Sequence, residues 1–231
     1  MKHVTSFSEL RSVTFLSEDS VHLRGSYASA HGESALTAIL VHDAGANRTC
    51  WEPYVPLFRT RGWNVLTFDL RGHGESVRQD MRHALLKADP ADLTSPHVYP
   101  ADIRAAVAFA ARQEFHQPGR IAILGVGFGS DLAYAASARG WGAVSTVCIS
   151  LDDDRAHALA GPGTFAPRSC YLMYGADDPV SVASGESFGV TAAVPSERFP
   201  YAGTAKKGLA LWRERQPEIL ARSISWIEKT T

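Results

Sequence analysis

The sequence predicts an α/β fold in which a mostly parallel central sheet carries helices on both faces. Three observations predict it. Strand-like and helix-like segments alternate along the chain, several strand-like segments are continuously apolar, and no linker or repeat divides the 231 residues. Because a chain of this length can build one large core, we expect a single α/β domain over residues 1–231.

Composition excludes several classes of protein. Hydrophobic residues make up 45% of the chain and charged residues 20%, as in ordinary globular proteins. The formal net charge is −1, so no bulk charge favours nucleic acid or an anionic membrane. The three cysteines form no Cys-x-x-Cys pair, and the chain has neither a signal-like N-terminus nor a long apolar run. We expect a cytoplasmic protein with no metal, no cofactor, no nucleic-acid partner and no membrane contact.

The first half of the chain opens with two strands around a short polar turn. The expected elements are, in order, strands over 13–16 and 21–27, a buried strand over 38–41, a helix over 53–61 that ends at a glycine, and a buried strand over 64–68. Residues 77–100 are harder to interpret. They fit a short helix with a loop, and they could line a site.

The second half continues the alternation of strands and helices. The expected elements are a helix over 99–115 with proline near its start, a strand over 120–124, a helix ending at 138, strands over 144–150, 170–174 and 197–201, and a final helix over 209–229. Since few residues separate the strands near 149 and 171, no large cap domain fits between them.

Four motifs follow one another in a fixed order, and together they resemble the α/β-hydrolase superfamily over about residues 11–229. The first resembles an oxyanion loop, the second an Asp-x-Arg-Gly-His-Gly-x-Ser turn, the third a nucleophile elbow and the fourth a loop that bears the acid of a triad. They are His42-Asp43-Ala44-Gly45, the run from Phe68 to Ser76, the run from Gly125 to Gly129, and the run from Tyr174 to Val180.

Two triad positions lack their usual chemistry. In the superfamily a sharp turn lifts the nucleophile above the sheet, but that position is Gly127 here, which has no side chain. The resemblance also implies a histidine after the last strand, yet the last histidine is His157. Lys206 matches the base position best, with Lys207 as the alternative. A lysine with a pKa of about 10.4 is protonated at neutral pH and is a poor general base.

The remaining candidate residues each have a functional and a structural interpretation. Asp178 matches the acid position and either pairs with Lys206 or is structural, as a solvated loop carboxylate or a helix cap. His73 lies in the turn motif and either transfers a proton or holds loops together. Ser130 and Cys50 are the other nucleophiles near the elbow. We expect Ser130 to pack or cap within its helix, and Cys50 to behave as a small apolar side chain.

The electrophilic half of a hydrolase site is expected to remain. The backbone N–H groups of Phe128 and of Ala44, or Asp43, should face one another at a helix N-terminus, where paired donors suit an anion or a carbonyl oxygen. Gly127 leaves space beside them and Lys206 adds positive charge. These features predict a ligand-binding site, formed by Asp43, Ala44, His73, Gly127 and Phe128, that prefers carboxylate ligands.

Three hypotheses for function follow. The first is a non-hydrolytic pseudo-hydrolase that binds a small-molecule ligand or a protein partner. The second is a non-covalent acid–base enzyme, of the cyclase, isomerase or lyase type, that uses His73, Asp178, Lys206 and the amide pair. The third is a hydrolase with an unrecognised nucleophile, and the residues favour it least.

Overall fold

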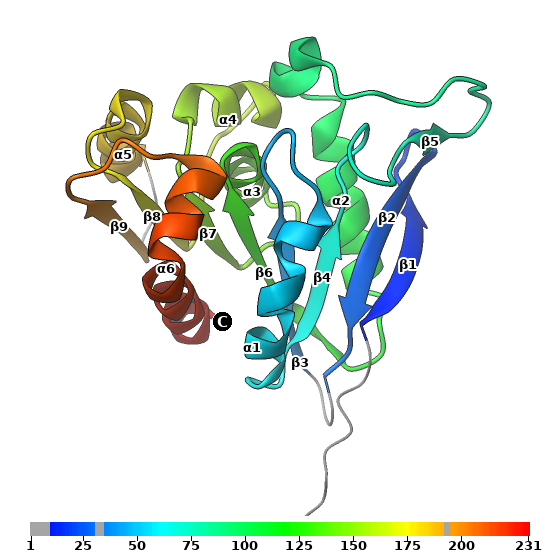
Figure 1. The fold of residues 1–231 in the computed structure, drawn as a ribbon, viewed down its shortest axis with the longest axis horizontal. Coiled ribbons are helices and arrows are strands. Elements are labelled where there is room, and N and C mark those ends of the chain that lie inside the picture. The colour runs from blue at the N-terminus through cyan, green and yellow to red at the C-terminus, as the bar shows by residue number, and fades with distance from the viewer. Residues whose placement is uncertain (1–9, 31–34, 192–194) are drawn as a thin grey trace, which may run out of the picture.

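The computed structural model describes residues 10–30, 35–191 and 195–231, which form a twisted sheet between two layers of helices (Figure 1). The order of the strands is β1-β2-β4-β3-β6-β7-β8-β9, and β5 pairs with β2. Neighbours from β4 to β9 are parallel, whereas β2 is antiparallel to β1, β4 and β5. The predicted mostly parallel sheet with helices on both faces is confirmed.

The strands are β1 (Arg11–Leu16), β2 (Val21–Ala28), β3 (Ala35–Val41), β4 (Asn64–Phe68), β5 (Arg78–Gln79), β6 (His116–Val126), β7 (Ser145–Ile149), β8 (Cys170–Gly175) and β9 (Ser196–Tyr201). The α-helices are α1 (Val55–Arg59), α2 (Tyr99–Ala110), α3 (Phe128–Ala138), α4 (Asp153–Ala160), α5 (Pro179–Thr191) and α6 (Gly208–Thr230). Three short 3-10 helices are η1 (Arg48–Cys50), η2 (Glu52–Tyr54) and η3 (Pro90–Thr94).

Two apolar layers hold the helices to the sheet. On one face α2, α3 and α4 pack over the strands, and on the other face α1 and α6 cover them (Figure 1). Every residue of β3 is buried, which explains the continuous apolar run in the sequence. The second layer includes an edge-to-face pair, Trp51 and Trp212, whose ring centroids lie 4.8 Å apart.

The structure corrects two of the expected elements. The helix that begins at Tyr99 ends at Ala110 rather than near residue 115, because the chain turns there to enter β6 and the carbonyl of Phe115 accepts a hydrogen bond from Ala35 N–H. The helix expected over 53–61 is divided into η2 and α1. Residues 77–98 contain the expected short helix, which is the 3-10 helix η3, together with loops and the strand β5, which was not expected.

Two further expectations concern the surroundings of the sheet. Between β7 and β8 the chain forms α4 and a short connection, so no cap domain is inserted there. Within residues 10–30, 35–191 and 195–231, no helix has both the length and the apolar character needed to cross a bilayer.

Candidate functional site

The turn between β6 and α3 has the backbone of a nucleophile elbow and no side chain at its apex. Gly127 is the N-cap of α3 and has φ 55° and ψ −122°, in a region that favours glycine. Its N–H donates to the carbonyl of Ile149 at the end of β7, which fixes the turn against the sheet. The elbow is therefore present without a nucleophile.

The carboxylate of Asp43 fills the space above this elbow. Its Oδ1 accepts hydrogen bonds from the backbone N–H groups of Phe128 and Ala44, each at 2.9 Å. A Cβ built on Gly127 would lie 2.1 Å from that same oxygen. The predicted pair of amide donors is present, but an oxygen of the protein itself already accepts from both.

His42 holds the backbone of Asp43 in place. The backbone N–H of Leu70 donates to His42 Nε2 at 3.0 Å, so Nδ1 carries the ring proton and donates to the carbonyl of Asp43 at 2.7 Å. Burial of the ring lowers the pKa of His42 to about 4, which keeps the imidazole neutral, as this pair of hydrogen bonds requires.

The N-terminus of a second helix, α6, also faces the Asp43 carboxylate. The N–H of Leu209, in the first turn of α6, lies 3.4 Å from Asp43 Oδ2. Gly208 precedes it with φ 53°, and a Cβ there would lie 2.2 Å from Oδ2 and 3.7 Å from the Cα of Gly127. Asp43, Gly127 and Gly208 therefore fit together as one unit. The carboxylate lies between the N-termini of α3 and α6, where the helix dipoles favour negative charge.

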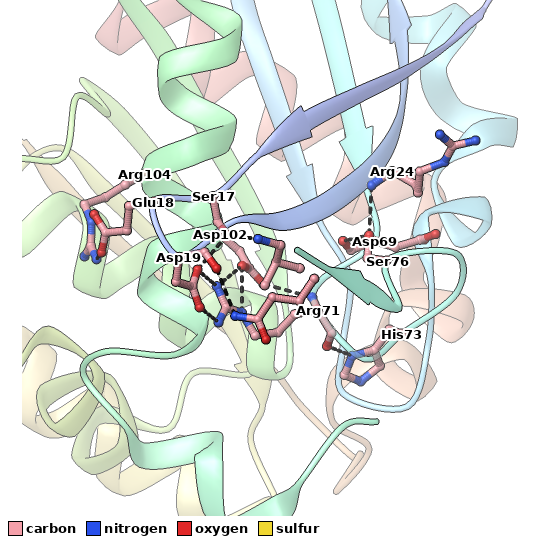
Figure 2. Close-up of polar contacts among 12 residues, drawn as sticks. Ser17, Glu18, Asp19, Arg24, Asp69, Arg71, His73, Ser76, Asp102 and Arg104 are labelled. Carbon is pink, nitrogen blue, oxygen red and sulfur yellow. Dashed lines mark hydrogen bonds and ion pairs between the residues drawn. The ribbon is translucent and has the colours of Figure 1, made fainter. Parts of the chain in front are cut away.

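His73 fastens the turn after β4 to the loop after β3. Its Nε2 accepts from Gly45 N–H at 3.1 Å. Its Nδ1 donates to the carbonyl of Arg71 at 2.9 Å (Figure 2). It lines a separate cavity of about 440 Å³ beside Ala44 and Tyr99. The structure does not bring His73 to the cavity above Gly127, and both ring nitrogens are engaged with backbone.

Arg71 ties the same turn to the neighbouring elements. Its guanidinium lies between Asp19 and the fully buried Asp102, with bonds of 2.6–2.9 Å to their carboxylates (Figure 2). Burial raises the pKa of Asp102 to about 6, and the Arg71 charge opposes that rise. Ser76 Oγ donates to the carbonyl of Asp69 at 2.7 Å. The turn motif thus frames the site.

Of the interpretations of Asp178, the structure shows the helix cap and not the pair with Lys206. Asp178 is buried, and its Oδ2 accepts from Ser181 N–H at 3.2 Å, which caps the first turn of α5. The ammonium of Lys206 is exposed and pairs with Glu214 on α6 at 2.6 Å. The neighbouring Lys207 lines the cavity, so the alternative assignment of the base position fits the geometry better.

The cavity above Gly127 has a volume of about 220 Å³ and is open to solvent on one side. It is lined by Asp43, Gly127, Phe128, Ser150, Leu151, Asp152, Arg155, Asp178, Val180, Ser181, Lys207 and Gly208. These residues come from the carboxyl ends of the strands and the starts of α3 to α6, the place where α/β sheets bind ligands.

Ser150 and Arg155 are among the polar residues of this cavity that sequence reasoning missed. Ser150 follows β7 with φ 62°, and its buried Oγ has no hydrogen-bond partner among the described residues. Arg155 donates from Nε to Asp131 Oδ2 at 2.6 Å. Burial raises the pKa of Asp131 to about 8, although Arg155 opposes this. The only signal for Ser150 was its place at the end of a strand.

The other candidate nucleophiles, Ser130 and Cys50, do not line this cavity. Ser130 is fully buried within α3, with its Oγ 3.5 Å from an oxygen of Asp131. Burial raises the pKa of the Cys50 thiol to about 12, so the thiolate is scarce at neutral pH. Burial likewise raises the pKa of the Cys148 thiol well above its usual value.

This fold and elbow define an α/β hydrolase, and the chain belongs to that family. The model of the alpha/beta hydrolase family matches residues 38–227. Among curated proteins the chain is similar to YfhR of Salmonella typhimurium, whose function is not characterised, with 29% identity over 171 residues. The match covers 72% of this chain and 51% of YfhR, so the chain spans about half the length of that relative.

Solved structures share the fold at low sequence identity. The esterase Pf2001 of Pyrococcus furiosus superimposes with a TM-score of 0.73 at 16% identity, covering 96% of this chain and 93% of the esterase. The α/β hydrolase GrgF from Penicillium sp. sh18 superimposes with a TM-score of 0.71 at 12% identity, covering 96% and 99%. At this identity the likeness concerns the fold alone.

Proposed function

We propose that the protein is a non-hydrolytic member of the α/β-hydrolase family that binds a small molecule in the cavity above Gly127. One observation supports this most strongly. The Asp43 carboxylate lies where a nucleophile's side chain would stand, and it accepts from the Phe128 and Ala44 amides at 2.9 Å.

Serine-type ester hydrolysis needs a nucleophile, a base and free donors for the oxyanion of the tetrahedral intermediate. Gly127 supplies no nucleophile, and the described residues place no histidine on this cavity. The donors are satisfied by Asp43, whose negative charge would also repel a developing oxyanion. All three requirements are therefore missing at the same place.

The hypothesis of a carboxylate ligand on the amide pair needs correction. Asp43 takes the position that such a ligand would occupy, and Lys206, the expected source of positive charge, pairs with Glu214 instead. A ligand in this cavity would bind beside Asp43 rather than in its place. A protein partner stays a prediction from the sequence.

Acid–base catalysis is the second candidate, with a different set of residues from the one the sequence suggests. Within the described residues, Asp43 Oδ2 accepts one hydrogen bond, from Leu209 N–H at 3.4 Å, and Lys207 lines the same cavity. A carboxylate and an ammonium on one small cavity can take and return a proton. Any turnover by this route should be lost in Asp43→Asn, whereas a change at Lys206 should leave it intact.

We expect the purified protein to hydrolyse 4-nitrophenyl acetate and butyrate no faster than a heat-denatured sample of it. We also expect no covalent labelling by a fluorophosphonate probe, because the described lining of the cavity places no histidine there to activate Ser150 or Ser181. Intact-protein mass spectrometry measures the labelling, with a known serine esterase as the positive control. Stoichiometric labelling at any serine, or saturable ester turnover lost on labelling, would overturn the proposed function.

A further inference from the structure

The starts of four helices meet at the cavity above Gly127, and each already has a carboxylate. Asp43 accepts from the first amides of α3 and α6. Asp152 Oδ1 accepts from Arg155 N–H at 3.1 Å at the start of α4, and Asp178 Oδ2 accepts from Ser181 N–H at the start of α5. Because these side chains offset the positive helix ends, the helix dipoles do not make the cavity an anion site.

The side chains that line the cavity leave it with a negative balance. The guanidinium of Arg155 is bonded to Asp131 and lies 3.8 Å from Asp152, so its charge is compensated within the protein. Among the described lining residues, Lys207 is then the remaining cation against the carboxylates of Asp43 and Asp178. Lys207 is exposed and has no ion pair among residues 10–30, 35–191 and 195–231, so it can turn toward solvent.

Ser150 gives an independent indication of a ligand. It is 6% exposed, it lines the cavity, and its Oγ has no hydrogen-bond partner in the described part of the chain. A buried hydroxyl without a partner is costly, and a positive φ at a residue other than glycine adds strain. A bound molecule that donates a hydrogen bond to Oγ would satisfy the hydroxyl.

We propose that this cavity binds a small molecule through a protonated amine, with Ser150 Oγ and the carboxylates of Asp43 and Asp178 as its acceptors. An ammonium group has three N–H donors and matches a cavity that offers acceptors and negative charge. Val180, which is 43% exposed, gives the same cavity apolar surface for the body of the ligand, above the buried Phe128 and Leu151. The proposal rests on the cavity named in the proposed function, and it holds whether or not a reaction follows binding.

The test compares three probes that share one apolar body: benzylammonium, benzyl alcohol and benzoate. Calorimetric titration at low ionic strength and pH 7 should show benzylammonium binding at least about tenfold more tightly than benzoate, with benzyl alcohol between them. Ser150→Gly removes the hydroxyl and suits the positive φ, and it should lower the affinity for benzylammonium by about five- to tenfold. Asp178→Asn keeps an oxygen that can accept from the first turn of α5, and it should lower the affinity for benzylammonium by about fivefold.

Asp154→Asn is the matched control, because it removes an exposed carboxylate on α4 that does not line this cavity. Its affinity for benzylammonium should equal that of the wild type, and thermal unfolding checks that each variant is folded. The ligand class would be overturned if benzoate bound as tightly as benzylammonium, or if benzylammonium did not bind at millimolar concentration. It would also be overturned if Asp154→Asn and Asp178→Asn lost affinity for benzylammonium equally. Different results, ester turnover or fluorophosphonate labelling, would overturn the proposed function.

Discussion

Replacing Asp43 with alanine is expected to lower the free energy of unfolding by about 2–3 kcal/mol. The carboxylate accepts from the amides of Phe128 and Ala44 at 2.9 Å and faces the start of α6. A hydrogen bond to a charged group contributes about 1.5–3 kcal/mol, and helix dipoles add to it. Water can reach the exposed Ala44 amide in the variant, which limits the loss. Urea unfolding followed by circular dichroism measures it.

Two further variants separate the possible causes of that loss. Asp43→Asn keeps an oxygen for the two amides without the charge, so its loss should be smaller than that of the alanine variant. Asp154→Ala removes an exposed carboxylate at the start of α4 and should change stability little. If Asp43→Ala were as stable as Asp154→Ala, the carboxylate would not hold the two helix ends together.

Gly127→Ser should destabilise the protein by about 2–4 kcal/mol, and Asp43→Ala in the same chain should relieve part of that cost. A Cβ at position 127 would lie 2.1 Å from Asp43 Oδ1, and the serine would also have to keep the backbone φ of 55°. Steric overpacking costs about 1–3 kcal/mol and a strained backbone adds about 1–3 kcal/mol. Removing the Asp43 carboxylate relieves the overlap and leaves only the backbone strain.

A double-mutant cycle measures this coupling from the unfolding free energies of the four proteins. We expect the double variant to be more stable than the sum of the single losses predicts, by at least about 1 kcal/mol. The double variant should still not hydrolyse esters, because no base accepts the serine proton. Strict additivity would show that Asp43 does not occupy the space of a side chain at 127.

The elements of the sheet could be predicted because each depends on a local pattern. The predicted strand over 64–68 coincides with β4, whose residues are all buried. The helix expected from 209 corresponds to α6, which begins at Gly208. The prediction of a helix over residues 111–115 was wrong because the helical sequence pattern continues where the chain must turn into β6. The conformation of these residues depends on a tertiary contact, the hydrogen bond from Ala35 N–H to the carbonyl of Phe115.

The site was only partly predictable, for a similar reason. The sequence shows that Gly127 lacks a side chain and that Asp43 lies in a loop that resembles an oxyanion loop. It does not show that Asp43 and Gly127 fit each other, because Asp43 and Phe128 are 85 residues apart and the contact depends on a rotamer. The choice between Lys206 and Lys207 lies in a loop without periodicity. Ser150 has no sequence signature beyond the end of a strand.

Titration of formate into wild type and Asp43→Ala shows whether Asp43 fills the oxyanion site, since formate has the size and charge of the missing carboxylate. We expect calorimetry to detect formate binding to Asp43→Ala and none to the wild type at the same concentrations. Formate should also restore part of the stability lost in the variant, as expected for a ligand that binds only the folded state. Equal binding of formate to both proteins, or none to Asp43→Ala, would contradict the claim that Asp43 fills the oxyanion site.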